Sequence, residues 1–194
     1  MRKTGKNLIV LAVLLAVGLL GLLTAPKAIR IIEEHSFPLR YKDTVEHYAA
    51  EFEMDPLMIY AIIRTESGFD QTAESAVGAR GLMQITEETF AWIKLKIAND
   101  EPLTFEDLWD PSVNIRFGSY YLSRCLERYG GNLATASAAY HSGWGTVDSL
   151  LADPTYADGE NTLKEFPYPQ MSRYVQKVGR AFEKYERLYR QKQE

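Results

Sequence analysis

One glutamate, Glu66, stands at the end of an apolar helical stripe, inside the stretch IRTESGFDQTAESAVGARGLMQIT of residues 63–86. Ile59, Ile62 and Ile63 precede it by seven, four and three residues, and on a helix these positions share its face. Apolar surroundings disfavour the ionised form of a carboxyl group, so this side chain should hold its proton to higher pH than usual. A carboxyl that is protonated near neutral pH can act as a general acid.

The helix that carries Glu66 is expected to end at Ser67-Gly68, which places the carboxyl at the rim of a cleft. Gly78 and Gly81 allow the following loop to fold tightly and to bring the GLMQ segment, residues 81–84, back toward it. Most glutamates near helix ends are solvated charges. The isoleucine stripe argues against that reading here and favours a general acid of the kind that breaks glycosidic bonds.

The elements that must position this acid are predicted to be helices. Asp55, Thr86 and Asp110 are expected N-caps, as is Asp43, and prolines follow Asp55 and Asp110 at the first helical position. No segment shows sustained strand alternation, although a minor hairpin could lie between Gly68 and Gly81. The sequence therefore indicates a mainly α domain, with helices expected over 43–52, 56–66, 87–98, 111–130, 132–140 and 171–191.

Composition excludes some classes of function. The chain has 22 Lys+Arg against 26 Asp+Glu, a net charge of -4 and no basic run, so nothing favours a nucleic-acid partner. The single cysteine, Cys125, is expected to be a buried thiol. His35, His47 and His141 are scattered and show no ligand spacing, so we expect no metal and no cofactor.

The N-terminus predicts a membrane anchor. Arg2, Lys3 and Lys6 precede residues 7–25, which contain no charge and approach the ~20 residues needed to span a bilayer. A cleaved signal peptide is the alternative, but the segment TAPKA is a poor cleavage site because proline intrudes. Positive charges before the span place the N-terminus in the cytoplasm. We therefore expect a single-pass protein of the cell membrane with its domain on the extracytoplasmic face, or else a secreted protein.

Three parts of the chain follow from this. Residues 1–25 form the cytoplasmic tip and the transmembrane helix, residues 26–42 a stalk, and residues 43–190 the folded domain. We expect the protein to be a monomer.

Several motifs extend the argument beyond one glutamate. ESGF, SAVGARGLMQ, DPSVNIRFGSYYL, AAYHSGWGTV and FPYPQMSRYVQKV occur in this order, and their spacing resembles that of the soluble-lytic-transglycosylase type of catalytic domain. That family is lysozyme-like and cleaves the glycan of bacterial peptidoglycan. The resemblance covers roughly residues 41–185, and it implies a lysozyme-like helical domain with a substrate cleft.

The resemblance also implies roles for single residues. Glu66 matches the only catalytic acid of the family. Asn114 and Gly118 match a motif that is mainly structural. The substrate-binding residues that the resemblance implies are Ser67, Met83, Gln84, Tyr140, His141 and Tyr174.

The chain departs from the family pattern at two of these motif positions. His141 stands where the family usually has asparagine, and Gln170 where it usually has glutamate. Asparagine and neutral histidine both donate and accept hydrogen bonds, so His141 is expected to substitute tolerably. It would then contact a sugar or, equally, be a satisfied polar group at a helix end. Gln170 leaves the role of that family glutamate open.

A single acid implies a particular mechanism. Asp70 is the nearest second carboxylate, and we expect it to be a turn residue. The resemblance implies that the substrate supplies its own nucleophile, so that Glu66 acts as acid and then as base and a 1,6-anhydro-N-acetylmuramic acid end is formed. A hydrolytic lysozyme-type muramidase and a non-catalytic glycan-binding protein are the alternatives. The expected partners are peptidoglycan strands and, through the N-terminal helix, the cytoplasmic membrane.

Overall fold

The computed structural model describes residues 2–190, apart from the side chains of residues 2–13 and 15–17. It divides the chain into two compact units, Met1–Pro38 and Leu39–Glu194, which are described here separately.

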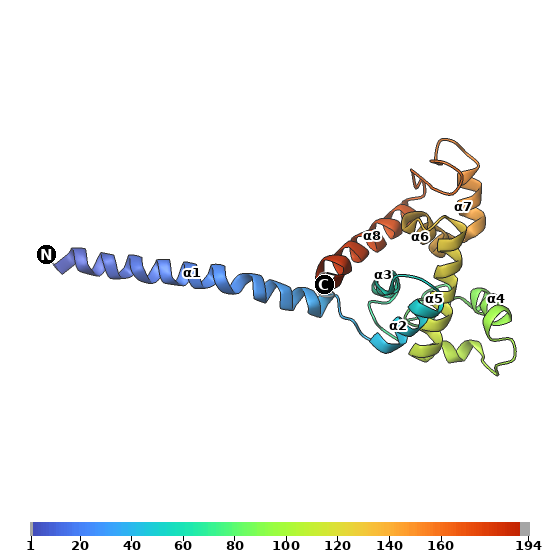
Figure 1. The fold of residues 1–194 in the computed structure, drawn as a ribbon, viewed down its shortest axis with the longest axis horizontal. Helices are drawn as coiled ribbons and strands as arrows, with labels where there is room; N and C mark the ends of the chain where they lie inside the picture. The colour runs from blue at the N-terminus through green and yellow to red at the C-terminus, as the bar shows by residue number, and fades with distance from the viewer. Residues whose placement is uncertain (1, 191–194) are drawn as a thin grey trace. The chain divides into compact units, whose positions relative to one another are not determined.

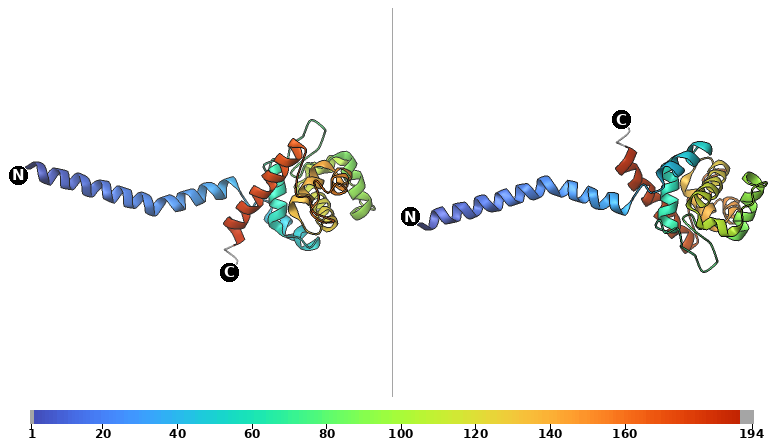
Figure 2. Two further views of the ribbon diagram at one scale, coloured as in Figure 1. Left: turned by 90° about the horizontal axis from the view of Figure 1, so that it is seen from above. Right: turned by 90° about the horizontal axis from the view of Figure 1, so that it is seen from below.

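The first unit contains one helix, α1 (Arg2–Ser36), with Pro26 inside it. A proline within a helix removes one backbone hydrogen bond and bends the axis, and Figure 2 shows α1 bent along its length. The expected stalk of residues 26–42 differs from this arrangement. Its first part continues α1 without a break, and the boundary between the units falls after Pro38.

Within the described part of the chain, none of the helices combines the length and the apolar character needed to cross a membrane. Half of the predicted anchor, residues 8–25, falls on positions whose side chains lie outside that part.

The second unit is built from helices, as Figure 1 shows. Between the helices, its described residues carry only isolated β-bridges, such as Glu74 with Arg80 and Arg80 with Ile85 in the loop after α3. The mainly α prediction is therefore confirmed. The elements are α2 (Lys42–Glu51), α3 (Pro56–Glu66), α4 (Glu87–Ile97), the short 3₁₀ helix η1 (Phe105–Trp109), α5 (Pro111–Arg128), α6 (Leu133–Ser142), α7 (Trp144–Leu151) and α8 (Pro169–Tyr189).

Most of the expected helix starts are confirmed by the side chains that cap them. Asp55 accepts a hydrogen bond from the Leu57 N–H at 2.9 Å, Thr86 caps α4 and Asp110 caps α5. The expected cap at Asp43 is wrong, because α2 already begins at Lys42 and Asp43 lies inside its first turn. There its charge still complements the positive end of the helix dipole.

Two helices were not predicted. η1 is short, and α7 begins directly after Gly143, between the helices expected over 132–140 and 171–191. Glycine at the start of α7 has φ 79, so the chain changes direction there and then resumes helical geometry.

The core of the second unit holds α3 in place. α3 and α6 both pack against α8, and α5 packs against α6. The predicted isoleucine stripe is confirmed, since Ile59, Ile62 and Ile63 are fully buried. On α8, Val178 and Tyr185 are equally inaccessible. The C-terminal end of α3, with Glu66, is thus fixed by a packed apolar face.

Candidate active site

Glu66 is the last residue of α3, and its carboxyl is held by one hydrogen bond from α8. The Tyr174 hydroxyl donates to Glu66 Oε1 at 2.6 Å. Burial raises the pKa of Glu66 from its ordinary 4.5 to about 7, and the bond from Tyr174 opposes part of that rise. In the described chain the carboxyl has no cationic partner. Near neutral pH both of its protonation states are therefore populated.

Ser67 ties the end of α3 to the loop that follows. Its hydroxyl donates to the Leu82 carbonyl at 2.8 Å and accepts from the Phe69 N–H at 3.2 Å. These bonds hold the GLMQ segment beside Glu66. The substrate contact expected of Ser67 stays a prediction.

Asn114 of α5 anchors the same segment from the other side. It is fully buried, it accepts from the Met83 N–H at 2.8 Å, and it donates to the carbonyls of Arg80 and Leu108 at 2.9 Å each. Gly81 is required here, since a Cβ at this position would lie 2.1 Å from the Asn114 side-chain nitrogen. The structural role expected for Asn114 is confirmed.

Met83 packs in the core next to the site. Its side chain is fully buried and lies so close to Gly118 that a Cβ there would be 2.4 Å from its sulfur. Met83 is not among the residues that line the cavity at Glu66, and the sugar contact expected of its side chain stays a prediction. The Met83 carbonyl accepts a 2.8 Å hydrogen bond from the Tyr140 hydroxyl.

Gln84 lines the cavity at Glu66, and its backbone is strained. Its φ is 50, which is unusual for a residue other than glycine. Its amide nitrogen donates to the carbonyls of Ala73 and Gly81 at 2.9 and 3.0 Å. Both donors are thereby used inside the loop, which leaves the amide oxygen as the polar atom available to a ligand.

These elements enclose a cavity of about 250 Å³ that contains Glu66. It brings together three of the predicted substrate-binding residues, Gln84, Tyr140 and His141. Tyr174 is buried behind Glu66. Tyr121 of α5 was missed, although it follows Tyr120 in the motif GSYYL and directs its ring at Tyr140, with centroids 5.2 Å apart. The remaining lining residues that sequence reasoning missed are Ser75, Val77, Ala79, Ile85, Thr86 and Thr89.

His141 lies at the mouth of the cavity, exposed. Its ring stacks on that of Tyr174, with centroids 4.5 Å apart and planes within 13°. The buried part of the ring lowers the pKa of His141, so the neutral form dominates at neutral pH.

Two further expectations are confirmed nearby. Asp70 is exposed and accepts from the N–H and the hydroxyl of Thr72 at 2.9 and 2.8 Å, which makes it a turn residue. Cys125 is buried, and its sulfur accepts a hydrogen bond from the Trp144 indole.

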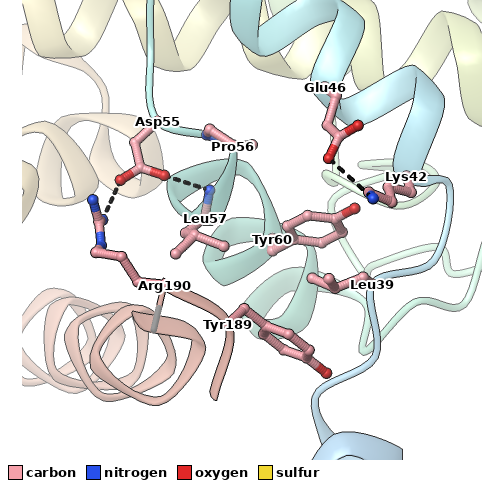
Figure 3. A pocket seen from close by; sticks show the side chains of 9 residues that line it. All are labelled: Leu39, Lys42, Glu46, Asp55, Pro56, Leu57, Tyr60, Tyr189 and Arg190. Atoms are coloured by element: carbon pink, nitrogen blue, oxygen red, sulfur yellow. Dashed lines mark hydrogen bonds and ion pairs between the residues drawn. The ribbon is translucent and has the colours of Figure 1, made fainter. Parts of the chain in front are cut away.

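A larger cavity of about 510 Å³ lies among α2, α3 and α8, as Figure 3 shows. Its charged groups are paired. Asp55 accepts from Arg190 and from the Leu57 N–H at the start of α3, while Lys42 lies 3.6 Å from Glu46. The Tyr60 hydroxyl is buried without a partner in the described chain, and burial raises the pKa of this phenol so that it stays neutral.

The cavity at Glu66 can therefore deliver and accept a proton. Of the residues that line it, Glu66 is the only carboxyl. A carboxyl with a pKa of about 7 can donate a proton to a leaving oxygen and, once ionised, can take one back. The usual glycosidase arrangement of two facing carboxylates is not formed by the lining residues.

The chain is similar to known lytic transglycosylases. It is 31% identical over 157 residues to the soluble lytic murein transglycosylase of Escherichia coli strain K12, covering 80% of this chain and 24% of that protein. It is 31% identical over 169 residues to the membrane-bound lytic murein transglycosylase C of Yersinia pestis, covering 76% of this chain and 47% of that protein.

Its fold matches solved structures of the same kind. The structure of an inactive mutant of the lytic transglycosylase Slt from Pseudomonas aeruginosa superposes with a TM-score of 0.71 and 33% identity, over 79% of this chain and 25% of that one. The chain thus spans about a quarter of the length of these soluble relatives. Residues 43–162 match the family model of the transglycosylase SLT domain. The chain belongs to the transglycosylase SLT domain family.

Proposed function

We propose that this protein is a lytic transglycosylase that cleaves the β-1,4 bond between N-acetylmuramic acid and N-acetylglucosamine in peptidoglycan. The observation that carries the proposal is the isolated carboxyl of Glu66, partly buried in a cavity and with a pKa of about 7. The family and the relatives named above support the same substrate class.

In the first step, protonated Glu66 gives its proton to the glycosidic oxygen. The bond from C1 of N-acetylmuramic acid to that oxygen breaks, and the N-acetylglucosamine portion leaves as an alcohol. The carbonyl oxygen of the substrate's own N-acetyl group bonds to C1 and stabilises its positive charge. This participation replaces the second carboxylate of ordinary glycosidases.

In the second step, Glu66 acts as a base. Its carboxylate removes the proton from the C6 hydroxyl of the same sugar while that oxygen attacks C1 and displaces the acetamido oxygen. The product carries a 1,6-anhydro end, and Glu66 is protonated again. Tyr174 stabilises the carboxylate between the two steps through its 2.6 Å hydrogen bond. An intramolecular nucleophile has a high effective concentration and needs no ordered water.

We also infer that residues 8–25 anchor the protein in the membrane, with the second unit on the extracytoplasmic face. The charge-free run of residues 7–25 after three basic residues supports this, as does the similarity to a membrane-bound relative. The protein should remain with membranes through a high-salt wash and should keep an N-terminus at or near Met1. A mature N-terminus near residue 26 or 29 would contradict the anchor.

The reaction is tested by mass spectrometry of the muropeptides that the full chain, in detergent, releases from purified sacculi. We expect products that end in 1,6-anhydro-N-acetylmuramic acid, lighter by one water than the hydrolysed muropeptides, and none from Glu66→Gln. Ordinary reducing ends would show a muramidase on the same fold. Binding to sacculi without any release would show a glycan-binding protein.

A further inference from the structure

The phenol of Tyr174 needs a fixed orientation to donate its hydrogen bond to Glu66. The backbone of Tyr174 alone does not fix the plane of that ring. The side chain projects from α8, and its hydroxyl bonds to a carboxyl at the end of α3. The strength of a hydrogen bond depends steeply on its angle. Whatever fixes the plane of the phenol therefore affects how well the Glu66 carboxylate is stabilised.

The ring of His141 lies flat on the ring of Tyr174. Their centroids are 4.5 Å apart and their planes are within 13°. His141 belongs to the last turn of α6, a helix that packs against α8. The stack therefore joins the two helices directly behind the catalytic carboxyl, with Tyr174 between His141 and Glu66.

Asparagine, the residue that the family pattern has at this position, could not make this contact. Its amide can donate and accept like neutral imidazole, which is why sequence reasoning treats the exchange as tolerable. An amide, however, has no aromatic ring to stack on the phenol. The geometry thus shows a property of His141 that its hydrogen-bonding capacity alone does not.

We propose that His141 is a positioning residue for the catalytic acid, its ring holding the phenol of Tyr174 in the orientation that donates to Glu66. The inference rests on the proposed role of Glu66. His141 acts through Tyr174 and takes no part in proton transfer.

The titratable groups beside His141 at the cavity come from four helices. Glu66 belongs to α3, Tyr121 to α5, Tyr140 to α6 and Tyr174 to α8. The three tyrosines have raised pKa values because of burial and stay neutral in the working range. Glu66 is consequently the group whose titration reports on the stack.

The test is the titration of the Glu66 carboxyl carbon by ¹³C NMR in the full chain, without substrate, with Glu66→Gln used to assign its signal. Tyr174→Phe removes the hydrogen bond and should raise the pKa of Glu66 by roughly 1–2. His141→Asn loosens that bond and should raise the pKa by roughly 0.4–1. His141→Phe keeps a ring and should leave the pKa at the wild-type value. His141→Gln provides a second variant without a ring.

The outcomes separate clearly. A wild-type pKa in both His141→Asn and His141→Gln would overturn the inference. So would His141→Phe shifting the pKa as far as His141→Asn, because the polarity of imidazole and not its stacking would then be responsible. Since no substrate is present, the titration gives its answer even if the muropeptide experiment shows no cleavage.

Discussion

The two cavities described above differ in how their charged groups are paired. The larger one, about 510 Å³, has Asp55 with Arg190 and Lys42 with Glu46 at its walls. The smaller one, about 250 Å³, holds the carboxyl of Glu66 with a phenol as its partner and no cation in the described chain. A cationic partner lowers the pKa of a carboxyl group, which then stays ionised and contributes to structure. A partly buried carboxylate without one has a raised pKa and can exchange a proton.

Volume is therefore a poor guide to the active site in this molecule. The larger cavity is bordered by the N-cap of α3, and its Lys42–Glu46 pair is solvent-exposed, with side-chain exposures of 59% and 50%. Exposed pairs of this kind contribute little free energy and mark no chemistry. The same helix thus begins at a structural carboxylate and ends at the proposed catalytic one.

The largest expected effect is the loss of turnover in Glu66→Gln. Glu66→Gln keeps the size and the bond from Tyr174 but cannot transfer a proton. General acid catalysis contributes about 10²–10⁴-fold, and a residue that acts twice should reach or exceed the upper end. Glu87→Gln, the same change at an exposed glutamate of α4, is the matched control. If Glu66→Gln still cleaved sacculi, the carboxyl without a cationic partner would not be what distinguishes the smaller cavity from the larger one.

The wild-type rate should also fall as pH rises, because protonated Glu66 starts the reaction. With a pKa of about 7 for Glu66, kcat/KM should decline above about pH 7, approaching tenfold per pH unit. A basic limb near the ordinary pKa of 4.5 would show that Glu66 is not perturbed in the free enzyme.

The next effect is on the free energy of unfolding of the protein, and it arises from the same side chain. Because the pKa of Glu66 is higher in the folded protein than the ordinary 4.5, the folded state binds the proton more tightly, and stability is lost as pH rises from about 4.5 to about 7. Each pKa unit corresponds to about 1.4 kcal/mol, so ionised Glu66 destabilises the fold by up to about 3 kcal/mol. Glu66→Gln should match the wild type near about pH 4 and exceed it near about pH 9 in denaturant unfolding. Parallel stability curves for the two proteins would contradict the raised pKa.

A smaller effect is expected at the other end of α3. Asp55→Ala removes the side chain that accepts from the Leu57 N–H at 2.9 Å, and loss of an N-cap costs about 1 kcal/mol. Arg190→Ala should cost less, because this side chain is 52% exposed and surface pairs contribute about 0–1 kcal/mol. Urea unfolding measures both. Turnover per folded molecule should not change, and its loss in either variant would give the larger cavity a function.

Much of this contrast could be predicted from the sequence. The caps at Asp55, Thr86 and Asp110 are local, since each requires only a side chain and an N–H two or three residues later. The burial of Glu66 followed from the isoleucine spacing along a single helix. These features depend on short stretches of chain, in which the spacing of residues along the sequence determines their relative positions in the structure.

The bonds that complete the site could not be predicted from spacing. The resemblance implies substrate contacts for Ser67 and Met83, which stay predictions. The structure shows a bond from Ser67 that holds the following loop and a packing contact of Met83 with Gly118, and neither was predicted. The stack of His141 on Tyr174 joins residues 33 positions apart on different helices. Such contacts arise from how α6 and α8 pack, and no periodicity within either helix encodes their register.

The smallest effect is expected at Asp70, the carboxylate that stands closest to Glu66 along the sequence. Its oxygen accepts two hydrogen bonds from Thr72, and these bonds lower the pKa of Asp70, so it is ionised throughout the working pH range and has no proton to give. Asp70→Asn keeps an oxygen that can accept both bonds. The melting temperature and the turnover on sacculi should therefore match those of the wild type. If Asp70→Asn were as damaging as Glu66→Gln while the fold stayed intact, the protein would use a carboxylate pair, and its products should then carry reducing ends.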